Sequence, residues 1–232
     1  MIKAGYRGKG FKLDQIKKEL IELSIKHLHG PEKIKLSKED VIVLCLVKDG
    51  EQYIEEFIEH YFKLGVKHIV FLDNMSSDRT LDIARKYDNV TVLQTGHPFR
   101  NNNDMRMREF LIEKYGKNKW SLTVDIDEFF DYPYSDIIKL KDLIRYLNIN
   151  DYTAVVTQML DLFPENILRF KKRKFDLKNH KYYEISNIIK NNYFFEECDF
   201  KKTDIKIYIG GIRKTIFCFE PWLTKHALLF YD

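Results

Sequence analysis

The sequence has few of the residues that mark a disulfide-stabilised, zinc-ribbon or membrane-spanning protein. Its 232 residues include three cysteines, at positions 45, 198 and 218, with no C-x-x-C spacing. An odd number of widely spaced cysteines argues against a disulfide framework and against a zinc ribbon. No run of about eighteen apolar residues occurs, and the N-terminus lacks an apolar stretch before a cleavage site. We therefore expect a cytoplasmic protein with no spanning helix, in which Cys45 is a buried thiol within an apolar strand.

The chain also has only a small excess of positive over negative charge. Lysine and arginine number 39 against 35 aspartates and glutamates, which leaves a net charge of +4. Such a small surplus predicts no nucleic-acid partner. Hydrophobic residues make up 44% of the chain and aromatic residues 14%, which excludes a disordered or low-complexity chain. The sequence therefore predicts a folded protein with a sizeable core.

The first forty residues differ from the rest in pattern. Apolar residues recur at spacings of three and four over residues 11–28, with lysines between them, which predicts an amphipathic helix. We expect this arm to pack on the domain and cover part of its core; a basic helix lying on an anionic membrane surface is the alternative. Residues 1–40 are thus interpreted as a helical arm and linker, and residues 41–232 as one domain. The spaced residues are Leu13, Ile16, Leu20, Leu23 and His27.

From residue 41 onward, predicted strands alternate with predicted helices. This order favours the α/β class, with an open, mostly parallel sheet flanked by helices. Ligands are then expected where the carboxyl ends of the strands open into loops. Gly65 and Gly116 are predicted helix stops. The predicted strands are 41–47, 66–72, 90–93 and 120–124, and the helices 52–64, 77–87 and 104–115.

After Asp127 the alternation ends. A helix over 137–147 and a strand over 154–160 are predicted, followed by 169–190, which is rich in lysine, aromatic residues and asparagine. That stretch is interpreted as a mobile insertion or an acceptor-binding lid. Residues 205–209 and 214–219 flank Gly210-Gly211 and predict a C-terminal β-hairpin region.

The strongest chemical signal is the pair Asp125 and Asp127, placed directly after an apolar strand. Alternate side chains of an extended chain share a face, so both carboxylates can point out of the sheet end. Mg²⁺ or Mn²⁺ takes one or two carboxylates and fills its other positions with water and phosphate oxygens. A solvated acidic strand end is the alternative.

A second polar loop follows the second strand, over residues 73–80. Asp73 and Asn74 could contact the base or ribose of a nucleotide, because they offer acceptor and amide groups at the expected mouth of the sheet. Ser77 and Asp78 are expected to cap the helix that follows.

Three segments together resemble the signatures of family-two-like glycosyltransferases with the GT-A fold. They look like K-N-E, D-N-G-S-T-D-G-T and W-x-x-x-x-D-x-D-E-F, in that order and between similar strands and helices. Shorter similarities lie at 159–164, 210–213 and 223–225, so the resemblance covers residues 41 to about 229. The three segments are Val47-Lys48-Asp49, residues 73–80 and residues 120–129.

The resemblance implies a nucleotide-sugar donor, usually a UDP-sugar, a divalent cation such as Mn²⁺ or Mg²⁺, and a glycan or lipid-linked acceptor. By that likeness Asp73 and Asn74 contact the nucleoside, Asp125 the ribose or a metal-bound water, and Asp127 the metal that bridges the diphosphate. Lys48 and Arg106 could add positive charge near the phosphates, with a solvated surface role as the alternative for each.

The chain departs from the family pattern in places. Met75 and Arg79 replace glycines of the second motif, and Asp49 and Gly50 stand where the first has Asn and Glu. His226 is the candidate for a further histidine near the metal, with a structural role as the alternative. An inverting transferase also needs a base within reach of the acceptor hydroxyl. The candidates for that base are Asp161, Glu184 and Glu220.

Two other functions fit parts of the pattern. A non-catalytic nucleotide-sugar binding module, or a truncated subunit that works with a partner, would keep the motifs without transfer. A haloacid-dehalogenase-like phosphatase also uses D-x-D after a strand. That motif continues to Thr or Val where this chain has Phe129, and it lies on an early strand.

Overall fold

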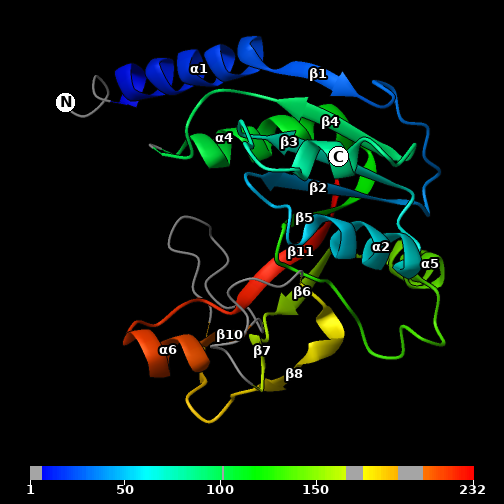
Figure 1. The fold of residues 1–232 in the computed structure, drawn as a ribbon, viewed down its shortest axis with the longest axis vertical. Coiled ribbons are helices and arrows are strands. Elements are labelled where there is room, and N and C mark those ends of the chain that lie inside the picture. The colour runs from blue at the N-terminus through cyan, green and yellow to red at the C-terminus, as the bar shows by residue number, and fades with distance from the viewer. Residues whose placement is uncertain (1–6, 101, 166–174, 193–205) are drawn as a thin grey trace. The chain divides into compact units, whose positions relative to one another are not determined.

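The computed structural model describes residues 7–100, 102–165, 175–192 and 206–232, and of residues 7–14 and 192 it describes the backbone only. The chain forms two compact units (Figure 1). The first comprises Met1–Thr153 and Leu229–Asp232, and the second Ala154–Leu228. This division lies inside the range 41–232 that the sequence led us to treat as one domain. Within the described ranges, no helix is both long and apolar enough to cross a bilayer.

The first unit is built on a mostly parallel sheet. Its strands lie in the order β1-β4-β3-β2-β5, and the last residues of β11 follow beside β5. β2, β3, β4 and β5 run parallel, while β1 is antiparallel to β4. The predicted α/β class is thereby confirmed. The bounds are β1 Lys26–His29, β2 Val41–Val47, β3 His68–Asp73, β4 Val90–Gln94 and β5 Lys119–Asp125.

Unbroken apolar runs explain the central strands. All seven residues of β2 and all six of β3 are buried, as expected for parallel strands covered on both faces. Cys45 on β2 is fully buried, so the predicted buried thiol is confirmed. Burial, and to a smaller extent the charge of Asp125, raises the pKa of this thiol well above its ordinary value, which makes it an unreactive core residue.

Helices α2, α3, α4 and α5 are shorter than predicted. Gly65 ends α2 with φ of 107°, so that predicted stop is confirmed. α4 ends at Leu111 and continues as a π-helical turn, Ile112–Gly116, to the second predicted stop. The bounds are α1 Arg7–Ser24, α2 Ile54–Leu64, α3 Thr80–Ala84, α4 Asn103–Leu111 and α5 Leu140–Ile149.

The N-terminal arm covers part of the core, as predicted, but through a different side of the helix. Ile21 is 2% exposed and belongs to the cluster that includes Met107 and Leu111 of α4. By contrast, Ile16, Leu20 and Leu23 of the predicted apolar face are exposed. The helix also ends at Ser24, because residues 26–29 form β1 and pair with β4 at the sheet edge.

The second unit contains two small antiparallel pairs, β7 with β8 and β9 with β10. β6 lies beside β11, which begins in this unit and ends in the first. The bounds are β6 Ala154–Gln158, β7 Leu162–Pro164, the 3-10 turn Leu177–Asn179, β8 His180–Tyr183, β9 Ile189–Asn192, β10 Lys206–Ile209, α6 Ile212–Phe217 and β11 Thr224–Tyr231.

The hairpin predicted around Gly210-Gly211 is wrong. β10 pairs with β9, and the expected second arm is helix α6. Gly211 takes φ of 73° just before that helix, and Lys214 N donates to Gly211 O in its first turn. The glycines thus end a strand and start a helix, and a short apolar run cannot distinguish these two outcomes.

The stretch 169–190 is described in part. Its first six residues, 169–174, lie outside the described residues, and the remainder contains the 3-10 turn, β8 and the start of β9. A role in binding an acceptor stays a prediction.

Candidate functional site

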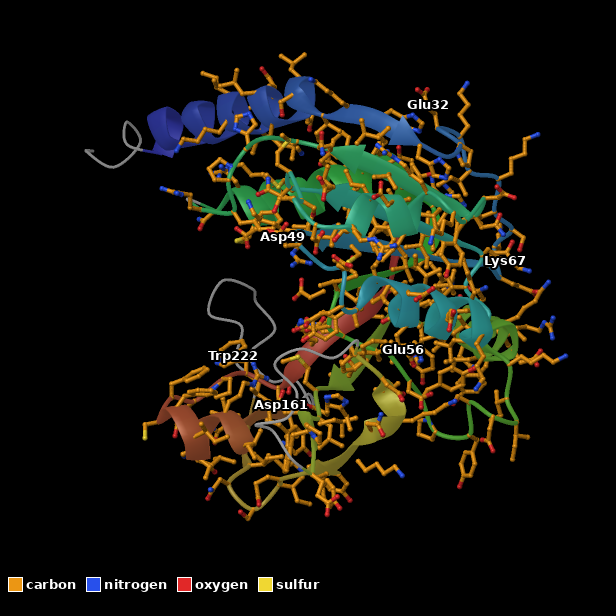
Figure 2. The ribbon with its side chains drawn as sticks, viewed as in Figure 1. Glu32, Asp49, Glu56, Lys67, Asp161 and Trp222 are labelled. Atoms are coloured by element: carbon orange, nitrogen blue, oxygen red, sulfur yellow. The ribbon has the colours of Figure 1, made fainter. Side chains whose placement is uncertain are left out.

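The carboxyl ends of β2, β3 and β5 lie side by side at one edge of the first unit's sheet. Val47 pairs with Asp73 on one side, and Leu46 pairs with Asp125 on the other. Neighbouring strands are about 4.8 Å apart, so the two acidic strand ends flank β2 at about 10 Å from each other. Figure 2 labels Asp49 at this end of the strands and Lys67, which precedes β3, at the opposite end.

Asp49 joins the loop after β2 to the loop after β3. Its backbone N donates to Ser76 Oγ at 2.8 Å, and its Oδ1 accepts from Ser77 N at 2.7 Å and from Ser77 Oγ at 3.1 Å. The predicted capping role of Ser77 is therefore wrong, because its hydroxyl and amide are engaged with Asp49 and the N-cap of α3 is Arg79. The signal for this contact was absent from local sequence, since it joins residues 27 and 28 positions apart.

A second set of bonds joins the same two loops. Gly50 N donates to Thr80 Oγ1 at 2.8 Å, and Glu51 N donates to Asp78 Oδ2 at 2.9 Å. Asp78 Oδ1 accepts from Thr80 N at 3.0 Å, as expected of a residue that supports a helix start. Burial opposes ionisation of Asp78, but the hydrogen bonds from Thr80 and Glu51 outweigh it and lower its pKa. The two loops thus form one hydrogen-bonded body.

Asp73 is fully buried, and its carboxylate is engaged inside the protein. Ser76 N lies 3.2 Å from Oδ1 and 3.1 Å from Oδ2, and Gln94 Nε2 donates to Oδ2 at 2.8 Å. Gln94 is also the residue directly opposite Asp73 on β4. The carboxylate thus shapes its own loop and anchors it to the neighbouring strand.

Asn74 connects three strand ends. Its backbone N donates to Val47 O at 2.8 Å, and its side-chain Nδ2 donates to Thr95 O at 3.1 Å and to His97 O. The side chain is 4% exposed. No hydrogen bond from the described residues reaches Asn74 Oδ1. That oxygen is therefore the atom with which this residue can accept a hydrogen bond from a ligand.

The turn after β5 is fixed by its own groups and by α2. Glu128 Oε2 accepts from Asp125 N, and Asp125 O accepts from Glu128 N, both at 3.0 Å. Tyr61 OH donates to Glu128 O and accepts from Phe130 N, both at 2.9 Å. Burial raises the pKa of Tyr61, so this hydroxyl keeps its proton and can serve both bonds.

The two carboxylates of the D-x-D pair have different surroundings. Asp125 forms an ion pair with Arg108 of α4, and its side chain is 40% exposed. Asp127 is exposed. Burial raises the pKa of the Tyr53 hydroxyl, and the negative charge of Asp127 raises it further.

These residues fit a cation that arrives with phosphate groups. In the described ranges, no group of three or more His, Cys, Asp or Glu side chains is arranged to hold a metal ion. Mg²⁺ and Mn²⁺ are bound by one or two carboxylates together with water and substrate phosphate oxygens. Asp127, with Asp125 beside it, is a donor set of that kind.

Arg106 lies elsewhere on the first unit. It lines a groove of about 770 Å³ between α1 and α4, and its Nη1 donates to Asn103 Oδ1 at 3.4 Å. The cation that pairs with Asp125 is Arg108, which sequence reasoning missed. Helical spacing could have found it: Arg108 follows buried Met107 and precedes buried Leu111 by three residues, on the side that faces the sheet.

The candidate bases and His226 belong to the second unit. Asp161 pairs with Arg213, Nε to Oδ2 2.8 Å, and Glu220 pairs with Lys214, Nζ to Oε1 2.6 Å. Glu184 accepts from Ser186 N, and the bonds from Ser186 lower the pKa of Glu184. His226 is exposed. Each carboxylate thus has a partner within its own unit.

No protein-family model matches the chain, and no curated protein sequence matches it. Solved structures with a similar chain path include S. aureus TarS, residues 1–349, with a TM-score of 0.41 and 19% identity over 62% of this chain and 40% of that one. Another is the mannosyltransferase PcManGT from Pyrobaculum calidifontis, in complex with GDP-Man and Mn²⁺. Its TM-score is 0.38 and its identity 16%, over 62% of this chain and 42% of that one. The matched part thus spans about two fifths of each of those chains.

Proposed function

We propose that this protein is a metal-dependent glycosyltransferase that moves a sugar from a nucleotide-sugar donor to a hydroxyl of a glycan or lipid-linked acceptor. The supporting observation is the register of β3, β2 and β5, which puts Asp73-Asn74, Lys48-Asp49 and Asp125-x-Asp127 at one edge of a parallel sheet. Those are the three segments that resemble glycosyltransferase motifs, and they occupy the sheet end where α/β proteins bind ligands.

The loop after β3 supports a uridine donor. Asn74 Nδ2 is engaged with two carbonyls, so Oδ1 is the side-chain atom that can face a base. This oxygen accepts a hydrogen bond from a ring N–H, which uracil and guanine carry and adenine does not. The donor in this proposal is therefore a UDP-sugar first and a GDP-sugar second. Exposed Lys48, at the end of β2, would lie on the phosphate side of that base.

Asp127, assisted by Asp125, would hold Mn²⁺ or Mg²⁺. When bound, the cation would offset the negative charge that develops on the departing nucleoside diphosphate. Asp127 supplies an exposed carboxylate on a turn that Tyr61 fixes in place. Asp125, two residues earlier, pairs through Oδ1 with Arg108. Asp161, Glu184 and Glu220 remain the candidates for the base that takes the acceptor proton.

The test is calorimetric binding of UDP, GDP and ADP with and without Mn²⁺, on the wild type and on Asp127→Ala. We expect UDP binding that requires Mn²⁺ in the wild type and is lost in the variant, with an unchanged circular dichroism spectrum. Asp136→Ala is the matched control, because Asp136 is another exposed aspartate of the same connection.

Wild-type binding by Asp127→Ala would reject Asp127 as the metal ligand, and equal affinity for UDP and ADP would reject the base preference. Release or transfer of sugar from UDP-sugars by the wild type then separates a transferase from a module that only binds the nucleotide sugar.

A further inference from the structure

Helix α1 presents an apolar stripe on the side that does not pack on the protein. Ile21 is buried against α4, and Lys18 Nζ lies 2.5 Å from Glu113 Oε1 on that packed side. Ile16, Leu20 and Leu23 follow each other at spacings of four and three, so they share another side of the helix. They are 51%, 53% and 84% exposed. The first unit therefore uses one side of α1 and leaves three large apolar side chains uncovered by the described chain.

The same segment carries most of the basic excess of the chain. Residues 1–24, which end with α1, contain three anions, Asp14, Glu19 and Glu22, and six cations, namely Lys3, Arg7, Lys9, Lys12, Lys17 and Lys18. Six minus three gives +3, and the whole chain has +4. The apolar stripe thus lies on a segment with a net positive charge.

We propose that α1 binds the surface of an anionic lipid bilayer through Ile16, Leu20 and Leu23, while its opposite side stays packed on α4. Apolar side chains on one side of a helix enter the boundary between headgroups and acyl chains, and neighbouring cations contact the anionic headgroups. The charge favours this occupant over a second copy of the chain, because pairing two α1 helices would bring two segments of the same net positive charge together. This inference does not depend on the proposed enzymatic function.

The test is flotation of the full chain with vesicles of phosphatidylcholine alone and of phosphatidylcholine with phosphatidylglycerol. We expect binding to the anionic vesicles that weakens as salt is raised, since salt screens the attraction of cations to headgroups. The triple variant I16S/L20S/L23S should lower the affinity by about tenfold or more, because three half-exposed apolar side chains lose their burial in the bilayer. Its circular dichroism spectrum should match the wild type, since all three side chains lie outside the core.

The matched control is I137S/I149S/Y152S, which removes three apolar side chains that are 75%, 74% and 53% exposed elsewhere on the first unit. This control should bind anionic vesicles like the wild type. Equal loss in both triple variants would overturn the proposal, as would unchanged binding by I16S/L20S/L23S or equal binding to neutral vesicles. A dimer in sedimentation that I16S/L20S/L23S alone abolishes, without vesicle binding, would assign the stripe to a second copy and also overturn it. UDP binding is measured in parallel, so a failure here is distinguishable from a failure of the nucleotide site.

Discussion

The polar segments that follow β3 and β5 both carry an aspartate of the candidate site, Asp73 and Asp127, yet the surroundings of these two residues differ. Asp73 is fully buried and accepts hydrogen bonds from Ser76 and Gln94. Asp127, in the turn after β5, is exposed. The carboxylate of Asp73 therefore helps to build the edge of the sheet, whereas that of Asp127 is exposed to solvent at that edge. A motif of polar residues after a strand does not reveal which of these roles each residue has.

The largest expected effect on stability comes from Asp73→Ala. This change leaves Ser76 N and Gln94 Nε2 without their buried acceptor, so the free energy of unfolding should fall by about 3 kcal/mol. Asp127→Ala should stay within about 0.5 kcal/mol of the wild type, as for an exposed residue. Urea unfolding followed by circular dichroism measures both. If the free energy of unfolding fell by a similar amount in the two variants, the two aspartates would not differ in their structural role.

Asn74, like Asp73, is buried. Asn74→Ala should cost about 2 kcal/mol, because the carbonyls of Thr95 and His97 lose a shared donor. Asn74→Asp should cost more than Asn74→Ala, since a carboxylate would face both carbonyls. The same urea experiment tests this order, and UDP binding by each variant shows whether affinity follows stability. An Asp variant as stable as the wild type would mean that the amide donors do not hold the loop.

Gly50 tests how tightly the loops after β2 and β5 are packed. An added Cβ would lie 2.8 Å from Val47 Cγ2 and 3.1 Å from Ile126 Cγ1. Gly50→Ala should therefore destabilise the protein by about 1.5 kcal/mol through overpacking. Gly96→Ala is the control, because its added Cβ has no heavy atom within 4 Å. Thermal unfolding of the two variants compares them, and equal midpoints would show that the loops adjust freely.

The smallest expected effect concerns the ion pair of Arg108 and Asp125. Its side chains are 28% and 40% exposed, so the pair should contribute about 0.5 kcal/mol at low salt and less at high salt. A double-mutant cycle with Arg108→Gln and Asp125→Asn measures the coupling, and Arg106→Gln is the control on the same helix. A coupling energy above about 2 kcal/mol would contradict this expectation and would mean that Asp125, like Asp73, stabilises the edge of the sheet.

The parallel sheet was predictable because its central strands are apolar along their whole length. Val41–Val47 is buried throughout, and its β-branched valines and isoleucine, followed by a polar loop, favour a buried strand over a helix. β1 was missed, because its four residues, Lys-His-Leu-His, lie at the sheet edge and continue the helical pattern before them. This segment is a strand because it pairs with β4, and not because its residues prefer a strand locally.

The site was predictable as a set of strand ends but not in its internal contacts. Asp125 and Asp127 could be chosen because they follow an apolar strand, but the expected shared strand face is wrong: β5 ends at Asp125, and Asp127 lies in the turn after it. The bonds of Asp49 with Ser76 and Ser77 join separate loops, so no periodicity could indicate them. The prediction of Arg106 misses Arg108, although the spacing of Arg108 from buried Leu111 indicates which of the two arginines lies toward the sheet.

The connection between the two units has a consequence for how the chain can be divided. The backbone leaves the first unit after Thr153 and returns at Leu229, and Phe230 N donates to Thr153 O at 2.8 Å beside these crossings. The second unit is therefore an insertion whose entry and exit points adjoin, an arrangement under which insertions are gained and lost with little effect on the host. Joining 153 to 229 through a few glycines would close a short loop at low entropic cost. Such an excised chain would keep all three strand ends, and would show whether the first unit folds as an autonomous nucleotide-binding module.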